Sequence, residues 1–148
     1  MGYSIKEVAE KFGLSIYTIR YYDKQGLLPF VGRNASGYRE FTESDLRFVH
    51  TICCLKDTGM KISDIKQYID YCMAGPATIA DRKRLLTAHR QQVVAQQKKL
   101  RENLQEIDYK LDVYNQPNAS DIITQQRQYV SQEKQANHLP NPFQKSNS

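Results

Sequence analysis

The sequence predicts a mostly α-helical protein, with a winged helix-turn-helix domain followed by one long helix that associates with a partner. Three observations lead to this fold class. Two short amphipathic segments follow Ser4 and Ser15 with a glycine between them. A glycine-containing segment of short apolar runs occupies residues 30–41, and residues 79–114 hold an apolar heptad pattern without Gly or Pro.

The first two helices are indicated by their end signals. Ser4 is an N-cap whose capping box is completed by Glu7, and Gly13 ends the helix. Ser15 caps the second helix, which stops at Gly26. The second helix should pack inward through Ile16, Ile19 and Tyr22. Its outward residues are then Tyr17, Thr18, Arg20 and Tyr21.

Residues 30–41 carry an Asn-Ala-Ser-Gly turn signal between short apolar or aromatic runs, which predicts a two-stranded wing. The hydroxyls, guanidinium and aromatic edges of the second helix suit contacts with phosphates and base edges. Tyr38 and Arg39 follow in the wing. The first two helices therefore read as a helix-turn-helix whose second helix is presented to DNA.

A second pair of helices follows the wing. Thr42 or Ser44 caps a third helix that ends near Gly59. Ser63 begins a fourth, which Gly75 and Pro76 close. Residues 1–75 are thus expected to form one compact DNA-binding domain.

Residues 78–115 are expected to form a dimerisation coiled coil, because the apolar stripe of so long a helix cannot be covered by so small a domain. A helix over residues 79–114 would be roughly 54 Å long. In the first half of this helix the second apolar position of each heptad is replaced by a polar residue. This half should therefore pack on something other than an identical helix, such as the partner's third and fourth helices. The seam comprises Ile79, Leu86, Val93, Leu100, Leu104, Ile107, Leu111 and Tyr114.

Residues 116–148 are rich in Gln, Asn, Ser and Pro and are expected to be a polar, partly disordered tail. One short amphipathic helix is expected after Ser120, and the last dozen residues are expected to be disordered.

The order of these parts resembles the MerR family of bacterial transcriptional regulators. The resemblance rests on TIRYYD in the second helix, GYREF in the wing, DTGMKISDI in the turn of the second helix pair, and the long heptad helix. It covers about residues 3–114. It implies a homodimer joined by an antiparallel coiled coil, bound to double-stranded promoter DNA at a palindromic operator. Such regulators bend and untwist the promoter spacer, and so act on RNA polymerase indirectly.

The resemblance also implies residue roles. Thr18, Arg20 and Tyr21 match positions that contact phosphates and bases, and Tyr17 occupies a variable position where sequence preference is set. The remaining residues expected to contact DNA are the helix cap Ser15, the wing residues Arg33, Tyr38 and Arg39, and Lys61 before the fourth helix. The alternative for Tyr22 is a place in the core.

Metal-sensing members carry cysteines at the start of the long helix and in a loop after it. This chain has Thr78, Ile79 and Ala80 at the first place and Asn115, Gln116 and Pro117 at the second, so no metal and no other cofactor is expected. Drug-sensing members append a ligand-binding domain, which the short polar tail cannot supply.

A cysteine in the third helix is a candidate sensor. On a helical wheel Cys54 falls opposite the buried side, with His50 one turn before it, where a positive charge would stabilise a thiolate. Cys54 also matches the cysteine of the AdhR/NmlR-like branch, which the resemblance links to aldehydes and other thiol-reactive electrophiles. Cys53 and Cys72 are expected to be inert packing. The alternative is that Cys54 has no sensing role.

Composition agrees with a DNA-binding regulator of the cytoplasm. The formal net charge is +5, three cysteines suit a reducing compartment, and no apolar run could span a membrane. The three histidines are scattered and no catalytic pattern occurs, so an enzyme is not expected. An architectural DNA binder would not need the heptads. A nutrient- or partner-protein-responsive repressor without a reactive thiol is the alternative function.

Overall fold

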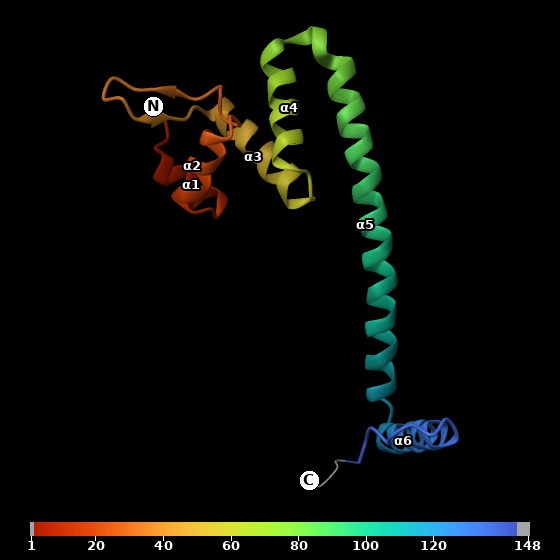
Figure 1. The fold of residues 1–148 in the computed structure, drawn as a ribbon. Helices are drawn as coiled ribbons and strands as arrows, with labels where there is room; N and C mark the ends of the chain where they lie inside the picture. The colour runs from red at the N-terminus through yellow and green to blue at the C-terminus, as the bar shows by residue number, and fades with distance from the viewer. Residues whose placement is uncertain (1, 145–148) are drawn as a thin grey trace. The chain divides into compact units, whose positions relative to one another are not determined.

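The computed structural model describes residues 2–144, and the chain divides into two compact units. The first unit extends to Ala95 and the second begins at Gln96. Figure 1 shows the helices and the small hairpin in chain order. The long helix α5 contributes residues to both units.

Helices α1 (Ile5–Phe12) and α2 (Ile16–Lys24) begin at the caps that the sequence predicts. The Ser4 side chain accepts a hydrogen bond from the Glu7 amide, and the Glu7 carboxylate accepts one from the Ser4 amide. Gly13 ends α1 with φ at 65°, in the left-handed region that favours glycine. Both predicted helices are confirmed.

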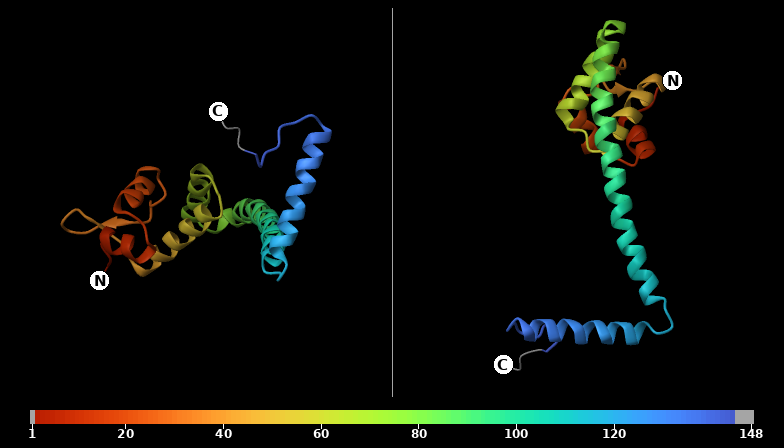
Figure 2. Two further views of the ribbon diagram at one scale, coloured as in Figure 1. Left: turned by 90° about the horizontal axis from the view of Figure 1, so that it is seen from below. Right: turned by 90° about the vertical axis from the view of Figure 1, so that its right-hand side faces the viewer.

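The wing consists of β1 (Gly32–Arg33) and β2 (Arg39–Glu40), which pair antiparallel. Beyond the ladder, Tyr3 and Phe41 form an isolated bridge through two backbone hydrogen bonds of 2.7 and 2.8 Å. Phe41 is buried, so this bridge fixes the base of the hairpin to the core. The hairpin tip projects from the helices in the left view of Figure 2.

Helices α3 (Glu43–Asp57) and α4 (Ile62–Ala74) complete the head, the domain predicted over residues 1–75. Thr42 caps α3 in a capping box with Asp45. The expected start of α4 at Ser63 is late by one residue, because the Lys61 carbonyl already accepts the amides of Asp64 and Ile65.

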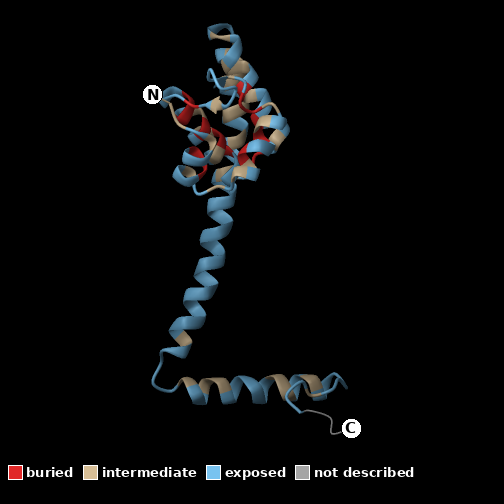
Figure 3. Ribbon diagram, turned by 90° about the vertical axis from the view of Figure 1, so that its left-hand side faces the viewer, coloured by how far each residue is buried: buried red, intermediate tan, exposed pale blue. Residues whose placement is uncertain are grey.

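The core lies among α1 to α4 and the base of the wing, as Figure 3 shows by burial. Helices α5 and α6 contain no fully buried residue. The buried apolar side chains are Val8, Ala9, Ile19, Tyr22, Leu27, Leu28, Val31, Phe41, Leu46, Val49, Ile52, Leu55, Met60, Ile65 and Ile69. Tyr22 therefore belongs to the core, the alternative that the sequence leaves open for it.

A polar cluster fixes the turn between α4 and α5. Gly75 caps α4 with φ at 90°, and the short helix η1 (Pro76–Thr78) follows. The Arg82 guanidinium donates to the carbonyls of Gly75 at 2.7 Å and Tyr71 at 3.2 Å. Arg82 also donates to the Thr78 hydroxyl at 3.1 Å. Arg82 thus satisfies carbonyls that the end of α4 leaves free.

Helix α5 runs from Ile79 to Tyr114, the 36 residues expected from the sequence. Its first turns pack on the head of the same chain, because Leu85 and Leu86 lie against the core cluster. From the sequence, this part was expected to pack on something other than an identical helix, such as the partner's third and fourth helices. The structure shows the head of the same chain packed there. The polar heptad positions that prompted that expectation, such as Lys83 and Arg90, are exposed.

The second unit contains the distal part of α5 and the helix α6 (Ala119–Ala136). The tail helix expected after Ser120 is present but 18 residues long, much longer than the short helix predicted. Phe143 contacts Arg127, whose guanidinium carbon lies 4.5 Å from the ring centre. Residues 145–148, within the segment expected to be disordered, lie outside the described residues. In residues 2–144 no helix is both apolar and long enough to cross a membrane.

Candidate nucleic-acid interface

The outward face of α2 carries the side chains that the sequence assigns to DNA. Tyr17 is 80% exposed, and Arg20 and Tyr21 are also exposed. On the opposite face of the same helix Ile19 and Tyr22 are buried. The 3.6-residue period of the helix produces this separation, so core packing holds the helix while its polar face remains free.

Two of the predicted contact residues bond to each other at the start of α2. The Ser15 hydroxyl accepts from the Thr18 amide at 3.0 Å, and the two hydroxyl oxygens are 2.9 Å apart. Ser15 is therefore the structural cap of α2, in addition to any contact that it makes with DNA. Thr18 is half-buried in this arrangement.

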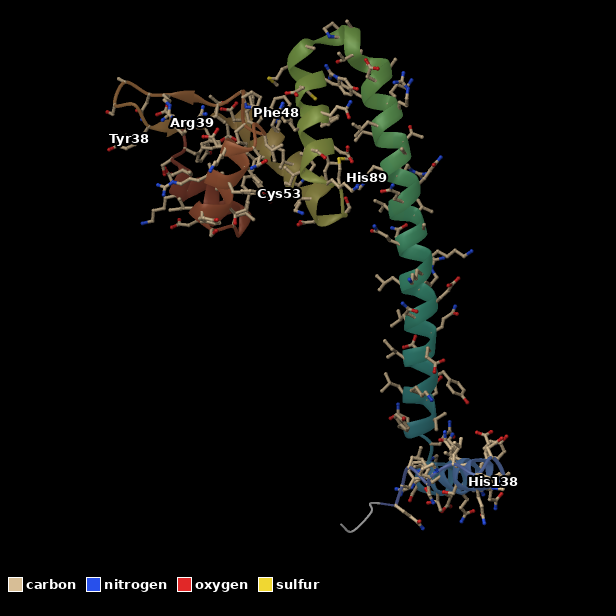
Figure 4. All side chains as sticks on the ribbon, viewed as in Figure 1. Tyr38, Arg39, Phe48, Cys53, His89 and His138 are labelled. Atoms are coloured by element: carbon tan, nitrogen blue, oxygen red, sulfur yellow. The ribbon has the colours of Figure 1, made fainter. Side chains whose placement is uncertain are left out.

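The tip of the wing is ordered by Asn34. Its side-chain oxygen accepts the amides of Ser36 at 3.0 Å and Tyr38 at 3.1 Å, which closes the turn. Gly37 has φ at 85°, a conformation that side chains rarely adopt. Arg33 donates to the Gly37 carbonyl at 2.8 Å, and Tyr38 is 73% exposed. The wing thus presents a tyrosine and an arginine from a fixed turn, as Figure 4 shows for Tyr38.

Arg39 is half-buried and is bonded to other groups of the protein. Its guanidinium donates to both carboxylate oxygens of Asp23, at 2.7 and 3.1 Å, and to the Val31 carbonyl. Each side chain of this ion pair is only 27% exposed. Asp23 lies on α2 and Arg39 on β2, so this bidentate pair fixes the wing relative to α2. Asp23 ends the TIRYYD motif, but no local pattern in the sequence indicates this ion pair.

Replacing Asp23 by alanine is expected to weaken DNA binding about three- to tenfold, because Arg39 loses the anchor that positions the wing. The direction is informative, since removing a negative charge beside DNA would by itself strengthen binding. Affinity is measured by fluorescence anisotropy on an operator duplex. Glu10→Ala is the matched control, because it removes an exposed carboxylate from α1. Tighter binding by Asp23→Ala would contradict the positioning role.

The remaining candidates lie on other elements. Lys61 is exposed and is the N-cap residue of α4. Cys54 and His50 are both exposed on α3, and no hydrogen bond joins their side chains within the described chain. Cys53 is half-buried, and this burial is the main cause that raises the pKa of its thiol. The nearby charges of Asp57 and Cys54 raise the pKa further. Cys53 is therefore a poor nucleophile near neutral pH, whereas Cys54 is open to solvent.

The predicted dimerisation seam is exposed along distal α5. Leu100 is 71% exposed, whereas Leu86 and Val93 in the first unit are half-buried. More than half of each side chain is exposed at Ile79, Leu104, Ile107, Leu111 and Tyr114. In residues 2–144 no three His, Cys, Asp or Glu side chains gather closely enough to hold a metal ion.

Helices α1 and α2 pack on the core through their apolar faces, α2 exposes its polar face, and the wing is anchored to α2. Together these features define a winged helix-turn-helix protein. The MerR HTH family regulatory protein model matches residues 3–72, and a MerR DNA-binding model matches residues 46–109. An HTH-type transcriptional regulator of Haemophilus influenzae is 41% identical over 119 residues, which cover 80% of this chain and 88% of that protein. The chain belongs to the MerR family of transcriptional regulators.

Two further relatives bear on the function. AdhR of Bacillus subtilis, an HTH-type transcriptional regulator, is 35% identical over 91 residues, covering 62% of this chain and 65% of AdhR. The crystal structure of HiNmlR is that of a MerR family regulator lacking the sensor domain and bound to promoter DNA. It matches with a TM-score of 0.72 and 42% identity, over 77% of this chain and 90% of HiNmlR.

Proposed function

We propose that the protein is a homodimer that binds an inverted-repeat operator in promoter DNA and alters the DNA path between the two half-sites. The observation that carries this proposal is the exposed face of α2, where Tyr17, Arg20 and Tyr21 stand beside a wing anchored by Arg39. The likeness to HiNmlR, which is bound to promoter DNA, supports it.

The two heads would each read one half-site. The exposed apolar seam of distal α5 supports association of two identical chains, because water-exposed leucines at heptad spacing are stabilised by a matching helix. We propose the antiparallel arrangement, with residues 78–115 as the dimerisation segment and residues 1–75 as the DNA-binding head. Ser15, Thr18, Arg33, Tyr38, Lys61 and Arg39, which is also bonded to Asp23, complete the proposed DNA-binding set.

Distortion of the promoter is energetically reasonable for such a dimer. Bending or untwisting a site of this size costs on the order of 1–6 kcal/mol. An effector that binds or modifies one dimer geometry better than the other supplies a comparable free energy. The dimer would thus act on RNA polymerase through the shape of the DNA.

The test is a titration against a duplex that carries the inverted repeat from the gene's own upstream region. Binding should weaken steeply between about 50 and 200 mM salt, because Lys and Arg displace counterions from phosphates. A scrambled duplex of equal length is the control. Equal affinity for the two duplexes would contradict sequence-specific binding.

We further propose that Cys54 senses electrophiles such as aldehydes. The Cys54 sulfur, as a thiolate, would attack the aldehyde carbon to form a C–S bond, and the carbonyl oxygen would then take up a proton. Exposure of Cys54 supports this role. A positive charge on His50, one turn earlier on α3, would stabilise the Cys54 thiolate.

Cys54→Ser is expected to abolish induction by formaldehyde or methylglyoxal, because a hydroxyl is far less nucleophilic than a thiolate. Transcription from the operator-bearing promoter is the readout. Cys53→Ser is the matched control and should respond normally, because burial raises the pKa of that thiol. An unchanged response by Cys54→Ser would favour the alternative function.

The alternative is a nutrient- or partner-protein-responsive repressor with no reactive thiol. The 18-residue helix α6, on which Tyr129 and the neighbouring glutamines are exposed, favours a partner contact by the tail. Capture of a defined partner by the full chain, but not by a chain ending at residue 115, would support this alternative.

A further inference from the structure

The end of α3 is joined to α5 by a hydrogen bond between distant residues. The hydroxyl oxygen of Thr58, which caps α3, lies 2.8 Å from Nε2 of His89. The same oxygen lies 2.7 Å from the Cys54 carbonyl and 3.2 Å from the Leu55 carbonyl. Figure 4 shows His89 on the side of α5 that faces the turn between α3 and α4.

The number of available protons shows which group donates in the hydrogen bond between Thr58 and His89. A hydroxyl has one proton, and the shortest contact of Thr58 is to the Cys54 carbonyl, which can only accept. Thr58 therefore donates to Cys54 and accepts from His89, so the Nε2 atom of His89 carries a proton. The result is a directed chain from the imidazole on α5, through the Thr58 hydroxyl, to the backbone of Cys54.

The residues around these hydrogen bonds are packed, so the hydrogen bonds couple the end of α3 to α5. Leu85, one turn before His89 on α5, packs against the core of the head. Met60, two residues after Thr58, is buried in that core. His89 also lines an open groove of about 470 Å³ between the start of α4 and α5, beside Gly59 and Met60. Movement of the last turn of α3 would therefore change the contact with α5.

We propose that Thr58 and His89 are positioning residues that transmit the chemical state of Cys54 to α5. This inference rests on the proposed sensing role of Cys54. An adduct on the Cys54 side chain would displace the last turn of α3 and the carbonyl to which Thr58 donates. His89 would then lose its acceptor, and the head would be free to change its angle to the dimerisation helix.

The test measures amide hydrogen exchange in the peptides that span residues 84–95 of full-length protein, before and after alkylation of Cys54 by iodoacetamide. The sulfur displaces iodide and leaves a stable adduct, which intact mass and peptide mapping locate. In the unsubstituted protein, alkylation should speed exchange about fivefold, the factor that one neutral hydrogen bond is worth.

Matched variants separate the hydrogen bonds from packing. Thr58→Val keeps the shape of the side chain but removes the hydroxyl, whereas Thr58→Ser keeps the hydroxyl. His89→Leu removes the donor, whereas His89→Gln keeps an N–H near the same place. In Thr58→Val and His89→Leu, which lack the hydrogen-bonding group, the peptides should exchange equally fast before and after alkylation. Thr58→Ser and His89→Gln should retain the fivefold change. Gln91→Ala, exposed on α5, is the control.

The outcomes distinguish the two proposals. If His89→Leu and Thr58→Val retain the full change in exchange on alkylation, the connection is overturned while sensing by Cys54 survives. If the unsubstituted protein is alkylated at Cys54 and α5 does not change, the connection is overturned in the native protein. An unchanged promoter response by Cys54→Ser overturns the sensing role itself, and the exchange experiment still reports whether Thr58 and His89 join α3 to α5.

Discussion

Replacing Leu104 and Ile107 together by glutamate is expected to convert the protein to a monomer and to weaken binding to an inverted repeat by a factor on the order of 10² or more. Both side chains are more than half exposed at neighbouring positions of the heptad seam. In the proposed dimer they pack against the partner's long helix, so the substitution buries four carboxylates without partners. Burying an unpaired charge costs several kcal/mol per ion.

The loss of DNA affinity follows from the loss of the dimer. A dimer that has bound one half-site presents its second head at a high effective concentration, and a monomer lacks this advantage. Sedimentation velocity measures the association state, and anisotropy measures affinity for the full repeat and for a single half-site. Affinity for the half-site should change much less.

Gln91→Glu with Gln105→Glu is the matched control for this substitution. It adds the same two charges at exposed positions of α5 that lie off the seam. The control protein should remain dimeric. A Leu104→Glu/Ile107→Glu protein that sediments as a dimer would show that the distal seam is not the interface.

Arg20→Ala is expected to weaken operator binding by roughly two orders of magnitude. Loss of one specific arginine contact costs about 1–3 kcal/mol, and a two-fold dimer loses the contact twice. Arg20 is exposed on α2, and within the described residues its side chain has neither an ion pair nor a hydrogen bond. The fold should therefore tolerate the change, with thermal unfolding within about 0.5 kcal/mol of the unsubstituted protein.

The pattern of loss identifies the atom that Arg20 contacts. If Arg20 reads a base, discrimination at one position of each half-site should relax. If it contacts a phosphate, affinity should fall on all sequences and the salt dependence should become shallower. Lys24→Ala, one turn further along α2, removes the same charge and should have a smaller effect. Equal losses for Arg20 and Lys24 would indicate only general electrostatic attraction.

The elements that sequence reasoning locates correctly are those determined by local signals. The capping boxes at Ser4 and Thr42 and the glycine at Gly13 depend on contacts within four residues, which the order of amino acids specifies directly. The same holds for α5, whose bounds at Ile79 and Tyr114 coincide with the heptad pattern. The wing follows from its turn residues.

The features that sequence reasoning missed are contacts between residues distant in the chain. Arg39 carries a guanidinium group, which suits a phosphate contact, and only the fold brings it to Asp23, 16 residues away in the sequence. His89 looks isolated on a long helix until the turn after α4 returns α5 to Thr58, 31 residues earlier. The length of α6 was underestimated because its polar sequence has few apolar positions to mark its end.

The sequence by itself determined the order and approximate limits of the helices up to Tyr114, the outward face of α2 and the apolar seam of α5, because helical periodicity and end caps act over one or two turns. Tertiary structure alone decided which arginine anchors the wing, which leucines of α5 lie on the head, and which residue bonds to the end of α3. These choices depend on three-dimensional packing, which brings together side chains that no local pattern connects.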